Sequence, residues 1–313
     1  MDHPPLTLDP QPVAVPAVPT VTRAACVLAL WRRPNGALLL IAPTLMFLSC
    51  FLVAPYVNML IMSFRNPSTS AVFAPGFTVG NYTRALTDPY YFGVLAQTVV
   101  LGAVTTLICV LIAYPVAYHL ARTSSRWKGL LYVGVLSPLL VGVVIRCYGW
   151  IILLANNGLI NNAVKKLGLV KQGLPLMYNS FGVGVGLVHV FLPFMVLPIL
   201  SAIQSIDPAL EDAARSLGAS RARTMARIVI PLSLPGIQAG AILVFVLSIS
   251  AYVIPILLGA LKVKLMPTLV VQLLIDAFLW PFGAALAFIL AASGGIVVYL
   301  FIRATGRLMR GLR

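Results

Sequence analysis

The sequence predicts an all-α integral membrane protein with six transmembrane helices. Only 9% of its residues are charged, whereas a soluble domain carries about 25%. Mean hydropathy is +0.99, and several apolar runs exceed the length of about 20 residues that spans the hydrocarbon core of a bilayer as a helix. The runs are continuously apolar and do not alternate with polar residues, which favours helices over a β-barrel.

The net charge of +15 has a topological explanation. The basic residues lie mainly in the short connections between apolar runs. With the N-terminus in the cytoplasm, 14 of the 22 lysines and arginines fall on the cytoplasmic side and seven on the outer side. This bias follows the positive-inside rule and predicts that both termini are cytoplasmic. We therefore expect lipid, and no nucleic acid, as the surrounding partner.

Six spans are expected in chain order. They cover residues 37–63, 92–121, 129–155, 181–205, 234–258 and 282–303. The first is too long for the apolar region of a signal peptide, so we expect it to be retained. The predicted organisation is a disordered cytoplasmic tail (1–36), a first helix with its outer loop (37–91), a five-helix core (92–304) and a basic cytoplasmic end (305–313).

Three connections are expected on the outer side, at residues 64–91, 156–180 and 259–281. The first two are long enough for short surface helices. Apolar residues at Leu159, Ile160, Ala163, Val164 and Leu167 have the spacing of an amphipathic helix, which could lie at the membrane interface or be an ordinary loop helix. Prolines inside the spans predict kinks, and the GVGVG run at 182–186 predicts close helix packing.

A polar, basic segment at residues 206–231 separates the fourth and fifth spans. Asp207 followed by Pro208 is a typical helix start, with a capping acceptor before a residue suited to the first helical position. The acids Glu211 and Asp212 favour this N-terminal end of the helix.

The rest of this segment predicts a turn and a second helix. Ala213 and Ala214 offer a flat face for a partner protein, and Gly218 permits a left-handed turn. A second helix is expected from residue 221 to 230, with Pro231 ending it. A plain basic loop would explain the arginines but not this placement of alanines, glycine and proline.

This segment resembles the EAA loop of the permease subunits of bacterial ABC importers. That loop has an acid, two alanines, a glycine six residues after the acid and a proline thirteen residues beyond the glycine. Here these are Asp212, Ala213, Ala214, Gly218 and Pro231. The usual glutamate is replaced by Asp212, with Glu211 just before it, so either carboxylate could make the usual contact. YPVAYHLAR (114–122), GLVHVFLPFMVLPI (186–199) and IPLSLPGIQAGAILVF (230–245) resemble the spermidine/putrescine-type branch.

The resemblance implies a six-span, type I importer fold in the bacterial inner membrane. It implies a second permease chain as pore partner, an ABC ATPase dimer docked on the loop, and a periplasmic solute-binding protein. The solute would be a polyamine moved by alternating access. The chain has no GxxxxGK[ST] phosphate loop, so we expect it to bind no ATP or other cofactor and no metal, and not to be an enzyme.

Candidates for the solute path are polar or aromatic residues within the predicted spans. They are Arg146, Tyr148 and Trp150 in the third span and Ser248, Ser250 and Tyr252 in the fifth. An arginine within a membrane helix is costly, so Arg146 should reach the interface or find a partner. Structural anchoring and a pathway role both remain open for it.

Two alternatives concern the solute and the class of transporter. No carboxylate lies clearly inside a span, and only Asp88 and Asp276 offset seven basic residues outside. An opine, amino-acid-derived or other small anionic solute is therefore a second reading. A secondary transporter would call for internal acidic relay residues and inverted repeats, neither of which is visible, and an integral-membrane enzyme would need a catalytic cluster that the sequence lacks.

Overall fold

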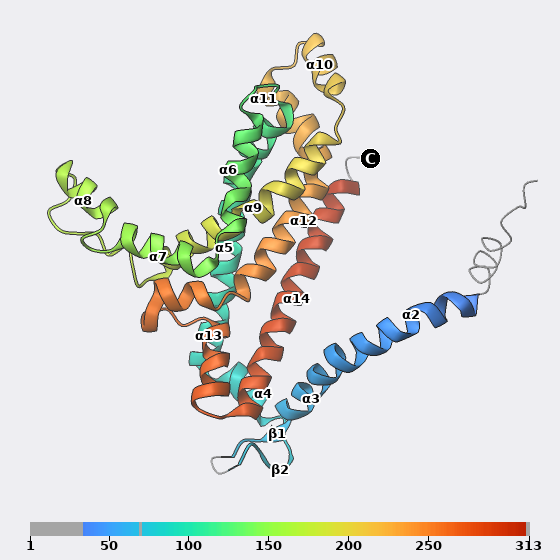
Figure 1. The fold of residues 1–313 in the computed structure, drawn as a ribbon, viewed down its shortest axis with the longest axis vertical. Coiled ribbons are helices and arrows are strands. Elements are labelled where there is room, and N and C mark those ends of the chain that lie inside the picture. The colour runs from blue at the N-terminus through green and yellow to red at the C-terminus, as the bar shows by residue number, and fades with distance from the viewer. Residues whose placement is uncertain (1–33, 69–70, 311–313) are drawn as a thin grey trace, which may run out of the picture. The chain divides into compact units, whose positions relative to one another are not determined.

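The computed structural model describes residues 34–68 and 71–310, and in these ranges it is helical apart from one two-stranded hairpin (Figure 1). Six described helical segments are long and apolar enough to cross a membrane. They are Ile41–Ser63, Pro89–Arg122, Val143–Lys166, Ser180–Gln204, Arg221–Ile249 and Trp280–Arg307. The all-α, six-span prediction is confirmed. Most of the tail expected at 1–36 lies outside the described residues.

The first span is one helical run containing a widened turn. It comprises α2 (Pro34–Leu48), a π-helical turn η1 (Ser49–Val53) and α3 (Ala54–Ser63). Pro55 is the second residue after the widened turn, consistent with the expected irregularities at prolines. Residues up to Asn58 belong to one compact unit and residues from Met59 to a second, which holds the other five spans.

Three helices form the centre of this unit: α5 (Pro89–Arg122), α9 (Ser180–Gln204) and α12 (Ile230–Ile249). They pack side by side, with α14 (Trp280–Arg310) against α12 (Figure 1). Gly236 of α12 lies against Pro198 and Ala202 of α9, where a Cβ atom would collide with both. Gly186, in the GVGVG run, is close to the side chain of Leu258. Close packing at that run is confirmed.

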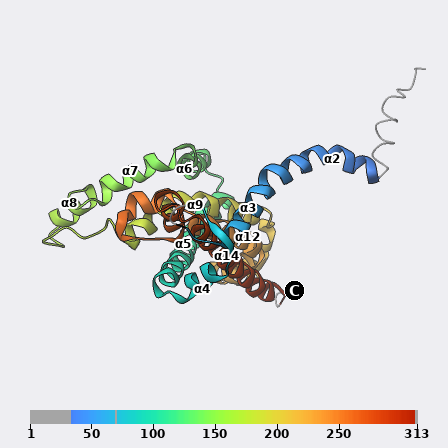
Figure 2. The same cartoon turned by 90° about the horizontal axis from the view of Figure 1, so that it is seen from below.

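The third span is not the single helix expected at 129–155. It is split into α6 (Lys128–Leu140) and α7 (Val143–Leu154). Pro138 cannot donate a backbone hydrogen bond to Gly134, whose carbonyl instead accepts one from the Ser137 hydroxyl at 3.2 Å. The helix ends two residues later and Gly142 has extended backbone angles. As a result, α7 and α8 (Leu159–Lys166) extend sideways from the bundle (Figures 1 and 2). The helix expected in the connection 156–180 is present as α8, but the apolar segment long enough to span is Val143–Lys166, which includes α8, and not 129–155.

The remaining outer connections carry more structure than a plain loop. Residues 64–91 contain the antiparallel strands β1 (Arg65–Asn66) and β2 (Ala74–Phe77), followed by α4 (Gly80–Thr87). The connection expected at 259–281 contains η3 (Pro255–Gly259) in part, η4 (Ala260–Lys262) and a further helix before α14. This helix comprises α13 (Met266–Val271) and the π-helical turn η5 (Gln272–Asp276).

The α13–η5 helix has its own apolar core. Met266, Leu269, Val270 and Leu273 are buried and pack in one cluster with Phe282 of α14. Their spacing of three, four and seven residues is that of an amphipathic helix, and this signal could have predicted the element.

Candidate functional site

The segment 206–231 forms a helix and a turn at one end of the bundle, beyond α9 and α12 (Figure 1). The helix is α10 (Pro208–Ser216). The Asp207 carboxylate accepts a hydrogen bond from the backbone N–H of Ala209 at 2.9 Å, and Pro208 occupies the first turn. This confirms the predicted helix start.

The turn after α10 is a Schellman motif closed by a left-handed glycine. The N–H of Gly218 donates to Arg215 O at 2.9 Å, and the N–H of Ala219 donates to Ala214 O at 3.0 Å. Gly218 has φ +83°, and a Cβ atom added there would meet nothing within 4 Å. The requirement for glycine is therefore one of backbone conformation and not of space.

Pro231 does not end the second helix, contrary to the prediction. Ser220 caps α11 (Arg221–Thr224), which continues through the π-helical turn η2 (Met225–Val229) into α12. Pro231 lies in the first turn of α12 and the helix runs on through it. Proline has no N–H group to donate to the helix, and the π-helical turn just before Pro231 accommodates this missing hydrogen bond. The segment therefore joins the fifth span without an intervening loop.

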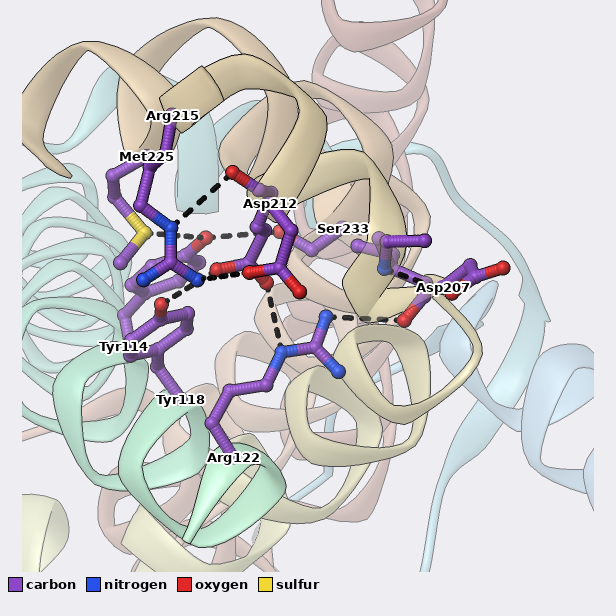
Figure 3. Close-up of polar contacts among 11 residues, drawn as sticks. Tyr114, Tyr118, Arg122, Asp207, Asp212, Arg215, Met225 and Ser233 are labelled. Carbon is purple, nitrogen blue, oxygen red and sulfur yellow. Dashed lines mark hydrogen bonds and ion pairs between the residues drawn. The ribbon is translucent and has the colours of Figure 1, made fainter. Parts of the chain in front are cut away.

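Glu211 is buried and connects α10 to the end of α5. The Tyr118 hydroxyl donates to Oε2 of Glu211 at 2.8 Å, and Nε of Arg122 donates to Oε1 at 2.8 Å. The Arg122 guanidinium also donates to Ile206 O at 3.0 Å. Figure 3 shows Tyr118 and Arg122 reaching from α5 toward α10. Only 7% of the Glu211 side chain is exposed, so this carboxylate is committed inside the protein.

Asp212 has the opposite surroundings. Its side chain is 70% exposed and pairs with Arg215 at 2.6 Å (Figure 3). Ala213 is exposed beside it and Ala214 is half-buried. Leu217, at the tip of the turn, is 90% exposed. The outward surface of α10 thus carries an acid, a small residue and an unpacked leucine.

An open cavity of about 880 Å³ lies between the end of α5, α10 and α11. Its lining includes the arginines Arg122, Arg215 and Arg221 as well as the carboxylates Glu211 and Asp212. The polar lining comes from three elements that the turn at Gly218 brings together.

The solute-path candidates of the third span separate in the structure. Arg146 and Trp150 are half-buried on one side of α7, whereas Tyr148 is 56% exposed. Nε and Nη1 of Arg146 are buried without a hydrogen-bond partner among the described residues. The Trp150 ring packs edge-on against the His189 ring of α9, with centroids 5.5 Å apart.

The candidates of the fifth span also have different surroundings. Ser248 is buried in α12, whereas Ser250 is exposed and donates to Val246 O at 2.8 Å. Tyr252 follows the end of α12 and lines a separate pocket with Gln272 and Asp276. These last two residues lie on the helix that the sequence reading missed, and so they were not among the candidates.

Comparison with known proteins gives the family. Residues 110–311 match the model of the binding-protein-dependent transport system inner membrane component. The chain is 34% identical over 259 residues to the spermidine/putrescine transport system permease protein PotB of Escherichia coli K12, which covers 83% of this chain and 94% of the relative.

Solved structures agree on the fold. A bacterial ABC transporter involved in the import of the acidic polysaccharide alginate superposes with a TM-score of 0.74 at 19% identity, covering 89% of this chain and 99% of that one. The alginate transporter in complex with its alginate pentasaccharide-bound periplasmic protein gives 0.72 at 17% identity, covering 92% and 96%. The chain therefore belongs to the family of binding-protein-dependent transport system inner membrane components: it is a multi-pass inner-membrane permease subunit of an ABC transporter and not itself the ATPase.

Proposed function

We propose that this chain forms half of the translocation path of an ATP-driven polyamine importer, and that α10 is the element through which the ATPase drives it. The single observation that supports α10 most directly is its outward surface, where Asp212, Ala213 and Leu217 are exposed at one end of the bundle. These residues lie outside the six candidate spans, so they form a surface that a soluble partner can reach. The EAA-type spacing supports the same partner.

The two carboxylates of α10 have separate roles in this proposal. Asp212 and the exposed Ala213 meet the ATPase, since the Asp212 side chain can leave its exposed pair with Arg215 at little cost. Glu211 stays inside and holds α10 to α5 through Tyr118 and Arg122. A displacement of α10 by the ATPase is then transmitted to the long helix α5, which biases the bundle between its two states.

The solute we propose is a polyamine of the spermidine/putrescine type. The support is the PotB relative, which aligns over 83% of this chain. A second permease chain completes the path, two ATPase subunits dock on the two α10 elements, and a periplasmic binding protein delivers the solute. Arg146, Trp150, Ser248 and Tyr252 are the residues of this chain that we place beside the path.

An opine or other small anionic solute is the second candidate. The observation that favours it is the excess of seven basic residues over two acidic ones on the predicted outer side. The fold itself is compatible with an anion, because the alginate transporter shares it. A secondary transporter is no longer an alternative, because the family is that of ABC transporter components.

A binding screen on the partner solute-binding protein separates these candidates. Spermidine, putrescine and octopine are compared by calorimetry, and each is then tested for stimulation of ATP hydrolysis by the assembled importer. We expect tight binding and stimulation with a polyamine. Binding and stimulation by octopine alone would favour an opine solute, and the absence of any co-purifying ATPase would contradict the proposal as a whole.

A further inference from the structure

A pocket of about 470 Å³ lies beyond the end of α12, between η3 and the α13–η5 helix. Its lining includes Tyr252, Lys264, Gln272 and Asp276. The volume is in the range of small-molecule sites in proteins. The pocket lies next to Tyr252, just after the C-terminal end of α12. The segment that contains α10 and α11 joins the other end, the N-terminus of α12.

Asp276 is the one carboxylate of the described residues that has no partner. Asp88 and Asp207 each cap a helix by accepting a backbone hydrogen bond. Glu211 and Asp212 each pair with an arginine. The exposed side chain of Asp276 forms neither a hydrogen bond nor an ion pair within the described part of the chain, so its charge is available to a ligand.

Local stability does not account for an acid at this position. Asp276 is the last residue of the helix that begins at Met266. A negative charge at the C-terminal end of a helix opposes the helix dipole and costs about 0.3–1 kcal/mol at an exposed site. Another residue that lines the pocket, Ala260, has φ +47°. Residues other than glycine rarely adopt this backbone conformation, and it tends to occur at ligand sites.

We propose that this pocket binds an ammonium group of the solute, with Asp276 as its counter-ion. The inference deepens the proposed function and rests on it. The Asp276 carboxylate would accept a charge-assisted hydrogen bond, and the Gln272 amide, which has no partner among the described residues, offers a second acceptor. The face of the Tyr252 ring can take part in a cation–π contact.

The lysine in the lining is not paired with this carboxylate. Nζ of Lys264 lies 5.8 Å from the ring centroid of Tyr90, a residue outside the pocket. No ion pair joins Lys264 to Asp276. Asp276 therefore has no ion-pair partner in the pocket and can pair with the ammonium group of the solute.

The test is uptake of radiolabelled putrescine into proteoliposomes that hold the complete importer, supplied with the loaded binding protein and ATP. The variants are Asp276→Asn, Asp276→Glu and Asp88→Asn. The last is a matched control, because it removes the other outer carboxylate while asparagine can still cap α5. Uptake is normalised to the amount of permease that co-purifies with the ATPase, so that misfolded protein does not count.

We expect Asp276→Asn to lower uptake about tenfold or more, as for loss of a hydrogen bond to a charged group. Asp276→Glu should restore much of it, and Asp88→Asn should match the wild type. Wild-type uptake by Asp276→Asn, equal loss in Asp88→Asn, or failure of Asp276→Glu to restore transport would each overturn the site. If the wild-type importer itself takes up no polyamine, the polyamine assignment fails, and the ammonium site with it.

Discussion

Glu211 and Asp212 are neighbours in the sequence, yet α10 turns their side chains into different surroundings. Glu211 is held by Tyr118 and Arg122 in a nearly closed environment. Asp212 lies on the surface with Arg215. Removing one partner of a buried ion pair is costly, because the remaining charge is left buried without a partner. An exposed pair contributes little.

We predict that Glu211→Gln destabilises the protein more than Asp212→Asn does. Loss of a hydrogen bond between charged groups at Glu211 should cost about 1.5–3 kcal/mol, whereas the exposed pair of Asp212 should contribute at most about 1 kcal/mol. Thermal unfolding of the two purified variants in the same detergent measures the difference. Equal unfolding temperatures would show that the buried contact does not hold α10 in place.

The same comparison separates attachment from docking. If Glu211 acts through Arg122, a double variant Glu211→Gln with Arg122→Ala should be more stable than the sum of the single changes predicts.

Asp212→Arg should unfold like the wild type but lose solute-dependent ATP hydrolysis. Normal stimulation of ATP hydrolysis in the assembled Asp212→Arg importer would argue against a contact with the ATPase.

At the scale of elements, the turn between α10 and α11 depends on one backbone conformation. Gly218→Ala should cost about 1–2 kcal/mol, because alanine is strained in the left-handed region, and it should reduce coupling of ATP hydrolysis to transport. Gly168→Ala is a matched control: Gly168 also has positive φ and open space around its Cβ position, but it lies after α8. Equal effects of the two variants on coupling would contradict a specific role for this turn.

Close packing of α9 against α12 gives another element-scale prediction. Gly236→Val should force the two helices apart at Pro198 and Ala202, at a cost of about 1–3 kcal/mol typical of overpacking. Gly295→Val, on α14, has no neighbour within 4 Å of the added Cβ and should be tolerated. Yield of monodisperse protein and its unfolding temperature measure both effects.

For the whole molecule, the apolar runs predicted five of the six spans well, since length and hydropathy decide what can cross a bilayer. They did not predict the break after Pro138, because many prolines inside spans are tolerated and only packing decides which one interrupts a helix. The helix at Met266–Asp276 was missed although its apolar spacing is regular. In a chain this apolar, a short helix is obscured by the longer runs around it.

Only the local features of the candidate site were predicted from the sequence. The start of α10 and the turn at Gly218 follow from local rules of capping and left-handed glycine, and both are confirmed. The burial of Glu211 was not predictable, because its partners Tyr118 and Arg122 lie about ninety residues earlier. The pocket around Asp276 likewise brings together residues from separate elements.

The most direct test of the central assignment, that α10 is the surface on which the ATPase docks, is site-directed cross-linking. Single cysteines replace Ala213, Leu217 and, as a control on the outer helix α8, Leu159 in a chain from which the native cysteines have been removed. All three positions are exposed. With the ATPase subunit and a cysteine-reactive cross-linker, we predict covalent adducts from positions 213 and 217 and none from position 159. Adducts from position 159 alone, or from none of the three in an importer that hydrolyses ATP, would contradict the assignment.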